Sequence, residues 1–196
     1  DDLSRGLGDV YKRQGVSSVT SADVVASNGI VHIVDAVIGL PSVVTFALAD
    51  PNFSSLVQAL TAYDYPQSFV GLLSIPAGSA PSPFTVFAPV NSGFESLLDE
   101  LGVNSLYDID EQTLGAVLSY HVVVSVNQMS NTLSDGMVIT TSLAQANPSI
   151  ADLTFNVGDN GEGILTDNNG RTSNIIAVDV QADNGIIHAI DTVVLP

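Results

Sequence analysis

Hydrophobic residues recur at helical spacing in the first half of the chain that follows residue 41. The pair Asp50-Pro51 is typical of a helix start, because proline fits the first turn, where its missing N–H is not needed. Behind this pair, four apolar side chains fall at positions i, i+3, i+4 and i+7 and therefore share one face: Phe53, Leu56, Val57 and Leu60. The pattern predicts an amphipathic helix that begins near residue 51.

Two further helices are indicated later in this half. Ser92 and Glu95 have the spacing of a capping box, in which the hydroxyl and the carboxylate each accept a hydrogen bond from a free backbone N–H. The apolar stripe behind this start is Phe94, Leu97, Leu98 and Leu101. Asp110 opens the next helix, whose apolar face is Leu114, Val117, Leu118 and His121. Because His121 stands at the end of this helix, we expect the helix dipole to favour its charged form.

From residue 122 onward the pattern changes to short segments rich in β-branched residues, which predict strands. The segments are 122–126, 137–141, 153–157, 163–166, 175–180 and 186–195, and an earlier one lies at 84–88. Asn-Gly pairs at 160–161, 169–170 and 184–185 favour hairpin turns, because both residue types tolerate positive φ. Helices followed by antiparallel strands predict an α+β fold.

One segment of the chain occurs twice. Residues 28–35 recur as residues 184–191, 156 positions further on, with the same Asn, Gly, Ile, His and Asp. Both copies are followed by Leu-Pro, at 40–41 and at 195–196. A period of this length exceeds that of solenoid repeats and indicates duplication of a whole domain. Because each copy would be a domain's last strand, we predict that residues 15–41 are the C-terminal strand remnant of a preceding domain and that residues 42–196 are one complete domain.

Residues 1–14 differ from the rest of the chain in charge. They hold three of its four Lys and Arg residues, and the run 9–14 resembles a translated adapter end from sequencing libraries. We interpret residues 1–14 as a non-native, adapter-derived segment, and the alternative is a native basic terminus.

The composition excludes several classes of function. A net charge of −17 repels phosphate backbones and anionic lipids, so nucleic acid is not expected as a partner. The chain has no cysteine, which excludes a disulfide scaffold and thiol chemistry. Its apolar runs are shorter than the roughly 20 residues that a membrane helix needs. With 45% hydrophobic residues, however, the chain can bury a core.

Three motifs carry a resemblance to a known family. They are the segment 84–94 (FTVFAPVNSGF), the pair Tyr120-His121, and the segment 184–191 with its following Leu195-Pro196. In this order and spacing, the chain resembles the fasciclin domain family over essentially all of residues 42–196. The resemblance implies a wedge-shaped antiparallel β-sandwich with several helices, mostly in the first half of the domain. It also implies tandem domains and adhesion at a cell surface or matrix.

The resemblance also implies roles for individual residues. The neighbourhood of Tyr120 and His121 is associated with integrin binding in some animal members of the family, which makes this pair the adhesion-associated motif here. The alternative is that the pair docks a helix end on the sheet. The remaining motif residues are expected to be structural: Thr85, Phe87, Ala88, Pro89, Asn91, Phe94, Asn184, Gly185, His188 and Asp191.

Neither catalysis nor a bound cofactor is indicated. The complete domain has only two histidines, His121 and His188, and it lacks a nucleophile elbow, an HExxH motif and a phosphate loop. His188 and Asp191 should point to opposite faces of a strand and so could not readily hold one metal ion. The acidic segments 159–162 and 167–170 have oxygen ligands for calcium. Their spacing does not fit an EF-hand, and we interpret them as hairpin turns; the alternative is loose calcium bridging between acidic surfaces.

Two functional hypotheses remain. The first is a secreted or cell-surface adhesion or matrix-binding module of a tandem-domain protein. Its partners would be a cell-surface or matrix protein or polysaccharide and the neighbouring domains of its own chain, with no nucleic acid and no membrane insertion. The second is a structural spacer domain that has no ligand of its own.

Overall fold

The computed structural model describes residues 19–35, 41–66, 68–147 and 152–196. Residues 1–14 lie outside this range, so their interpretation as an adapter-derived segment stays a prediction. Contacts divide the chain into two units, Asp1–Pro41 and Ser42–Pro196. The described part of the first unit is a hairpin of β1 (Val19–Ala26) and β2 (Gly29–Val34), and all residues of both strands are exposed. The assignment of this unit to a preceding domain stays a prediction.

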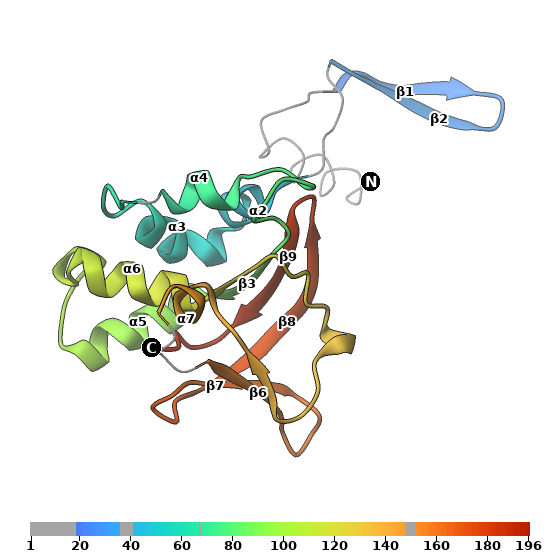
Figure 1. Ribbon diagram of the computed structural model, residues 1–196. Helices are drawn as coiled ribbons and strands as arrows, with labels where there is room; N and C mark the ends of the chain where they lie inside the picture. Colours follow the sequence, from blue (N-terminus) through green and yellow to red (C-terminus); the bar gives the residue numbers. More distant parts are fainter. Residues whose placement is uncertain (1–18, 36–40, 67, 148–151) are drawn as a thin grey trace. The chain divides into compact units, whose positions relative to one another are not determined.

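A seven-stranded sheet forms the framework of the second unit, in the order β4-β3-β9-β8-β7-β6-β5 (Figure 1). The strands are β3 (Phe84–Pro89), β4 (Val122–Val124), β5 (Met137–Ile139), β6 (Leu153–Val157), β7 (Gly163–Thr166), β8 (Thr172–Ala182) and β9 (Gly185–Ile190). Neighbouring strands are antiparallel except for β3 and β9, which are parallel. The expected α+β fold with a mostly antiparallel sheet is therefore confirmed.

The long strand β8 joins the two halves of this sheet. Its first residues pair with β7, and its residues from Ile175 onward pair with β9. Two register shifts between Ile175 and Val180, together with a φ of +59° at Asp179, bend the strand as β-bulges do. One hydrophobic core lies between the helices and the strands β3 and β9, and a second is enclosed by strands β3 to β7 and β9.

The helices gather on one side of β3 and β9 (Figure 1). They are α2 (Val43–Ala49), α3 (Ser54–Leu60), α4 (Phe69–Leu73), α5 (Asn91–Leu101), α6 (Glu111–Tyr120) and α7 (Ser142–Ala146). The 3₁₀ turns are Pro51–Phe53, Leu106–Asp108 and Ser130–Thr132. The predicted helix behind Pro51 and the helix capped by Asp110 are confirmed. The sequence pattern did not reveal α2, α4 and α7, which have five to seven residues and no 3₁₀ turn directly before them. The equally short α3 continues the 3₁₀ turn Pro51–Phe53, and the two together are long enough to repeat the hydrophobic period.

The predicted capping box is wrong. Helix α5 already includes Ser92, and its start at Val90 has no side-chain cap. The neighbouring Asn91 instead serves another helix: its Oδ1 accepts a hydrogen bond from the Ser55 N–H at 2.9 Å, and its Nδ2 donates one to the Pro51 carbonyl at 2.9 Å. Asn91 therefore ties the start of α5 to the start of α3, which a local pattern does not reveal.

The predicted strands are confirmed in position, although three are shorter than expected. The strands β4, β5 and β9 end at residues 124, 139 and 190. Gly161 and Gly170 have the positive φ that the hairpin pattern predicts, +85° and +77°. The turn between β8 and β9 is formed by residues 183–184, because Gly185 already pairs with Ala182 as the first residue of β9, and neither Asn184 nor Gly185 is among the residues with positive φ.

Candidate functional site

His121 joins the end of α6 to the last segment of the chain. Its Nδ1 lies 2.7 Å from the Val117 carbonyl oxygen, and its Nε2 accepts a hydrogen bond from the Val194 N–H at 3.2 Å. Because Nε2 is an acceptor, Nδ1 carries the proton and the ring is neutral. Burial lowers the pKa of His121 to about 4, although the bond to Val117 acts in the opposite direction. The expectation of a charged His121 is therefore wrong, since desolvation outweighs the helix dipole.

Tyr120 and His121 are both buried, with exposed fractions of 0% and 3%. Burial raises the pKa of Tyr120 to about 12, so its phenol is neutral. The Tyr120 ring lies in the core that the sheet encloses. Neither side chain reaches the surface in this fold, so a partner could not contact the pair directly. The adhesive role implied for this pair stays a prediction. In this fold the two residues would have to act indirectly, by holding the residues that do contact a partner in place.

His188 is also fully buried and holds the sheet to the segment after β4. Its ring stacks on Phe87, with centroids 5.6 Å apart, and its Nε2 lies 2.8 Å from the Gln128 carbonyl oxygen. Its Nδ1 accepts a hydrogen bond from the Asp179 N–H at 3.4 Å. The Asp179 carboxylate accepts hydrogen bonds from the N–H and the hydroxyl of Ser130, which lower its pKa. Both ring nitrogens of His188 are thus used inside the fold.

Asp191 has a different set of partners from His188. Its carboxylate accepts hydrogen bonds from the backbone and side-chain amides of Asn174, at 2.8 and 2.7 Å, and from the hydroxyls of Ser173 and Thr192. Burial pushes the pKa of Asp191 upward, but these donors outweigh it and the pKa lies below its ordinary value. The structure does not bring His188 and Asp191 together as a metal site.

Asn184 and Gly185 position β9 rather than shape a primed turn. The buried Asn184 side chain accepts from the Val43 N–H at 3.0 Å and donates to the carbonyls of Leu73 and Ile75, at 2.8 Å each. A Cβ atom at Gly185 would overlap the backbone of Phe84. The pair is therefore required by the contacts of β9 with α2, α4 and β3.

The remaining motif residues lie in β3 and at the start of α5. Thr85 is fully buried, donates through Oγ1 to the Val126 carbonyl at 2.8 Å and accepts from the Gln128 N–H at 2.9 Å. Ala88 and Phe94 are each 2% exposed, and Pro89 ends β3 opposite Ile190. The structural roles that we expect for these residues stay predictions.

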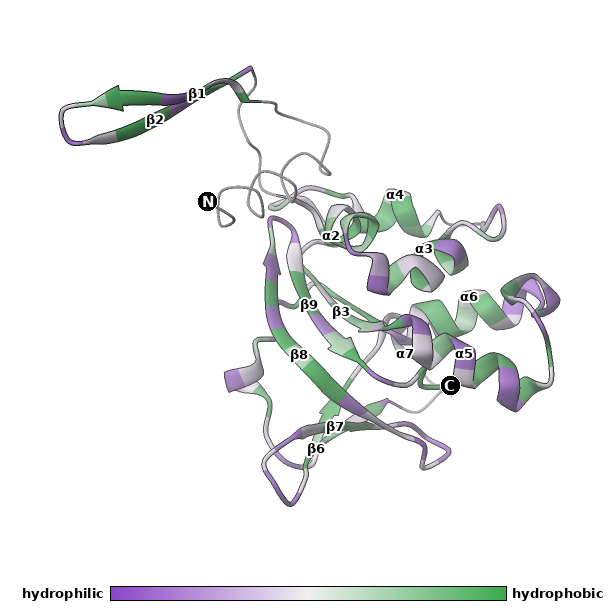
Figure 2. Cartoon of the chain, turned by 180° about the vertical axis from the view of Figure 1, so that it is seen from behind, coloured by the Kyte–Doolittle hydropathy of each residue, from purple (hydrophilic) through white to green (hydrophobic). Residues whose placement is uncertain are grey.

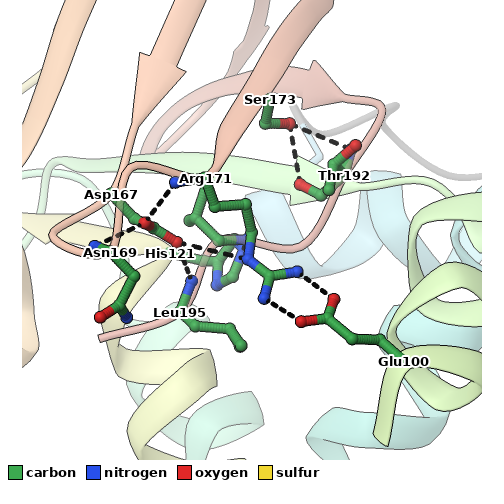
Figure 3. A network of polar contacts seen from close by, with 9 residues as sticks. Glu100, His121, Asp167, Asn169, Arg171, Ser173, Thr192 and Leu195 are labelled. Atoms are coloured by element: carbon green, nitrogen blue, oxygen red, sulfur yellow. Dashed lines mark hydrogen bonds and ion pairs between the residues drawn. The ribbon is translucent and has the colours of Figure 1, made fainter.

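Asp167 and Arg171 lie in the connection between β7 and β8, where they form a clamp of polar contacts (Figure 3). Oδ1 of Asp167 accepts from the N–H groups of Asn169 and Arg171, at 2.9 Å each, and Oδ2 accepts from the Leu195 N–H at 3.0 Å. The guanidinium of Arg171 binds both carboxylate oxygens of Glu100, at 2.5 and 2.6 Å, and its Nε lies 3.5 Å from Oδ2 of Asp167. The hydrogen bond to Glu100 raises the pKa of Arg171.

This clamp was missed by the sequence patterns. Its signal was present, because Arg171 is the only Lys or Arg after residue 14 and it stands four positions after an aspartate. The buried carboxylate of Asp167 is surrounded by donors, so the segment 167–170 is a turn organised by its own aspartate. Among the described residues there is no group of three or more His, Asp or Glu that could hold a metal ion. Within the same residues, none of the helices has the length and apolar character to cross a membrane.

The described surface also has a groove of about 520 Å³ beside α4 and α6. Its apolar wall comes from α4 and the segment before it, and its polar rim comes mainly from the first turns of α6. The lining includes Tyr65, Pro66, Phe69, Leu72, Asp110 and Glu111. A concave, mostly apolar surface with a few polar groups is the usual form of a binding site.

Hydrogen bonds and burial fix the protonation states of the titratable groups around this groove. Tyr65 and Phe69 pack edge to face, with centroids 5.0 Å apart, and the Tyr65 hydroxyl donates to the Ala59 carbonyl at 2.8 Å. Burial raises the pKa of Tyr65 to about 12, so it stays neutral. The hydrogen bonds that Asp110 accepts from Thr113 lower the pKa of Asp110, which stays ionised. The groove therefore combines an aromatic wall with an acidic rim.

Comparisons with known proteins agree with this architecture. The family model of the fasciclin domain matches residues 51–196. The chain belongs to the fasciclin domain family. Among the relatives of this fasciclin chain is the uncharacterized protein sll1735 of Synechocystis sp., which is 32% identical over 80% of this chain and 98% of its own length. Periostin of Homo sapiens is 29% identical over 93% of the chain, which spans 20% of periostin.

A solved structure has the same fold. It is a fasciclin domain pair from the insect cell adhesion molecule Fasciclin I, which matches with a TM-score of 0.60 and 24% identity. The match covers 93% of this chain and 61% of that one. The fold of this fasciclin chain is thus one that occurs in a cell adhesion molecule.

Proposed function

We propose that this fasciclin chain is a non-catalytic adhesion or matrix-binding module of a secreted or cell-surface protein with tandem domains. Its membership in the fasciclin domain family is the observation that carries the proposal. The match to a domain pair supports the tandem arrangement, because it extends over 93% of the chain. A non-catalytic role is supported by His121 and His188, whose ring nitrogens are all engaged in bonds within the fold.

The groove beside α4 and α6 is the binding surface in this proposal. Its aromatic wall would take an apolar group, and Asp110 and Glu111 on its rim would attract a positive charge beside that group. The net charge of −17 acts in the same direction, since it repels anionic partners. A neutral polysaccharide or a basic segment of a matrix protein fits these properties, and an anionic glycosaminoglycan or nucleic acid does not.

A tandem arrangement adds the contacts of single domains through their effective concentration. The test uses the full chain and arrays of two and three copies of residues 42–196. Each is passed over fibrillar collagen, a neutral glucan and an anionic glycosaminoglycan in surface plasmon resonance at physiological salt. We expect weak retention of the full chain on collagen or on the glucan, stronger retention of the arrays, and the least retention on the glycosaminoglycan.

A matched pair of variants tests the role of the groove. Glu111→Arg reverses a charge on the groove rim, and Glu95→Arg makes the same change on the exposed surface of α5, outside the groove lining. Retention should fall for the first variant and stay unchanged for the second. Equal effects of the two variants would contradict a role of the groove.

The second candidate is a structural spacer domain without a ligand of its own. It is favoured by the burial of Tyr120 and His121, which keeps the family's adhesion-associated motif away from the surface. Failure of the three-domain array to bind any of the tested surfaces would support the spacer and contradict adhesion.

A further inference from the structure

The β1–β2 hairpin repeats the backbone geometry of the β8–β9 hairpin. Asp23 and Asp179 occupy equivalent positions, and both have a left-handed backbone, with φ of +57° and +59°. In each hairpin the N–H of this aspartate donates to Nδ1 of the equivalent histidine, His32 at 3.2 Å and His188 at 3.4 Å. A positive φ outside glycine is uncommon, so its presence at both positions indicates one shared local structure.

The strand register is the same in both hairpins. The first pairs Val19 with Val34, Val24 with Val31 and Ala26 with Gly29. The second pairs Ile175 with Ile190, Val180 with Ile187 and Ala182 with Gly185. Register shifts also fall at equivalent places. The duplication therefore preserves a bulged hairpin and its pairing.

The surroundings of the two hairpins differ. In the second unit, β9 is buried along its whole length, with β8 on one edge and the parallel β3 on the other. β2 belongs to a two-stranded sheet, and its side chains are exposed: Ile30 is 61% exposed, whereas the equivalent Ile186 is 0% exposed. Figure 2 shows hydrophobic residues along both strands of the first hairpin. An exposed hydrophobic strand with a free edge is an established hazard for aggregation, which proteins avoid by covering it.

The glycines of the two hairpins show which neighbouring strand the first hairpin lacks. A side chain at Gly185 would overlap the backbone of Phe84 in β3, whereas a Cβ at Gly29 meets no atom within 4 Å. Likewise Asn184 is buried and bridges two helices, whereas Asn28 is exposed. The first hairpin thus carries residues whose physical requirement is found only beside a β3 strand and its helices.

From this comparison we propose that the β1–β2 hairpin is a docking element that closes a second fasciclin body. A fasciclin body is here a segment equivalent to residues 42–171, which is the domain without its β8–β9 hairpin. This body, supplied by a preceding repeat, places a strand equivalent to β3 parallel to β2 along its free edge. The inference rests on the tandem arrangement proposed above and adds the surface and the occupant.

The register of the complete domain defines this interface. Phe84 lies opposite Gly185 and Phe87 lies opposite His188, so the docked strand presents its equivalent residues to Gly29 and His32. An aromatic ring then stacks on His32, and a backbone carbonyl accepts from its Nε2, as Phe87 and Gln128 do for His188. The exposed side chains of β2 become buried, which supplies the main driving force.

Three positions that are buried in β9 differ in size between the two hairpins: Val31 and Val34 stand where β9 has Ile187 and Ile190, and Ile33 stands where it has Ala189, which is 6% exposed. Only the last of these places a larger side chain in the first hairpin. The body that the first hairpin closes in nature must have room for the larger side chain. In a body taken from this chain the extra carbons would be overpacked, which would weaken the docking. An Ile33→Ala variant removes this obstacle.

The test is a longer chain in which residues 42–171 are placed directly before residues 16–196 and in which Ile33 is replaced by Ala. The β1–β2 hairpin then follows Arg171 as β8 does. In the control chain, residues 42–196 precede residues 16–196, so the first body already has its own hairpin. Hydrogen exchange is followed in residues 19–34 of each chain and of the parent.

We expect amide exchange in residues 29–34 to slow on the order of 100-fold in the test chain, relative to the parent and the control. Gly29→Val should abolish this protection in the test chain and leave the exchange of the parent unchanged. Fast exchange in the test chain, with its first 42–171 segment degraded by protease, would overturn the proposal.

A concentration-dependent dimer of the parent chain with protected residues 29–34 would also overturn it, because a second copy would then be the occupant. The binding of collagen or glucan is not measured in this experiment, so its failure is distinct from failure of the adhesion proposal.

Discussion

Nε2 of His121 accepts a hydrogen bond from the backbone N–H of Val194, 73 residues further along the chain. This bond fastens the last segment of the second unit to the end of α6. It requires an unprotonated Nε2, while the opposite nitrogen donates to Val117. Protonation of His121 would therefore remove an acceptor that the closed fold needs and would place a charge in the core.

We predict that the stability of the second unit falls as the pH decreases from about 6.5 to about 4. The pKa of His121 is lowered from 6.5 to about 4 by burial, so in this window the unfolded chain binds a proton that the folded chain does not. The contribution is fully present above pH 6.5 and is lost towards pH 4. Its total is roughly 3 kcal/mol. Urea unfolding followed by circular dichroism across this window measures it.

His121→Gln is the control for this pH dependence. Glutamine has both a donor and an acceptor but does not titrate. The variant should be less stable at neutral pH, and its stability should change less between about pH 6.5 and about pH 4.5. An undiminished slope in the variant would assign the pH dependence to other groups. The carboxyls with lowered pKa, such as Asp191, lose their stabilising effect at lower pH, so the slopes of the two proteins are compared only down to about pH 4.5.

Gly185→Ala and Gly29→Ala form a pair with opposite expected results. The first places a Cβ against the backbone of Phe84, which cannot move away without disrupting the pairing of β3 and β9. We expect the second unit to lose about 3 kcal/mol of stability. The second places a Cβ in open space and should leave the unfolding midpoint of the second unit unchanged. A tolerated Gly185→Ala would refute the close approach of the two strands.

Asn91→Ala and Ser92→Ala distinguish the observed helix start from the predicted capping box. Asn91 accepts from the N–H of Ser55 and donates to the Pro51 carbonyl. Its truncation should cost about 1 kcal/mol, as the loss of a helix cap does. Ser92→Ala should change the free energy of unfolding by no more than about 0.5 kcal/mol, because that side chain caps no helix. A larger effect for Ser92→Ala would restore the capping box. Thermal unfolding of both variants decides the matter.

Arg171→Met tests the clamp around Asp167. The variant keeps most of the side-chain volume but removes the cation that faces a fully buried carboxylate. Three backbone donors remain, so we expect a loss of roughly 2 kcal/mol rather than the full cost of an unpaired buried charge. Glu100→Gln is the control: it changes an exposed partner and should have a small effect that decreases with salt. A destabilisation by Glu100→Gln as large as that by Arg171→Met would place the main interaction at the surface.

The sequence by itself determined the elements with long or alternating patterns. The stripe of α6 and the alternation of β6 and β7 are local periods of about 3.6 and 2 residues, which a reader can find without knowing the fold. The duplicated segment likewise indicated the tandem arrangement, because identity between two distant segments needs no coordinates. The order of three motifs was sufficient for the family.

The tertiary structure alone decided what individual polar residues do. Asn91 serves a helix 36 residues earlier in the chain, and Asn184 bonds to Val43 across 141 residues. His121 is neutral because the core around it excludes water, and Gly185 is required by the backbone of a strand about 100 residues away. These requirements depend on which distant atoms meet in the folded state, and a local pattern of hydrophobic and polar positions does not contain that information.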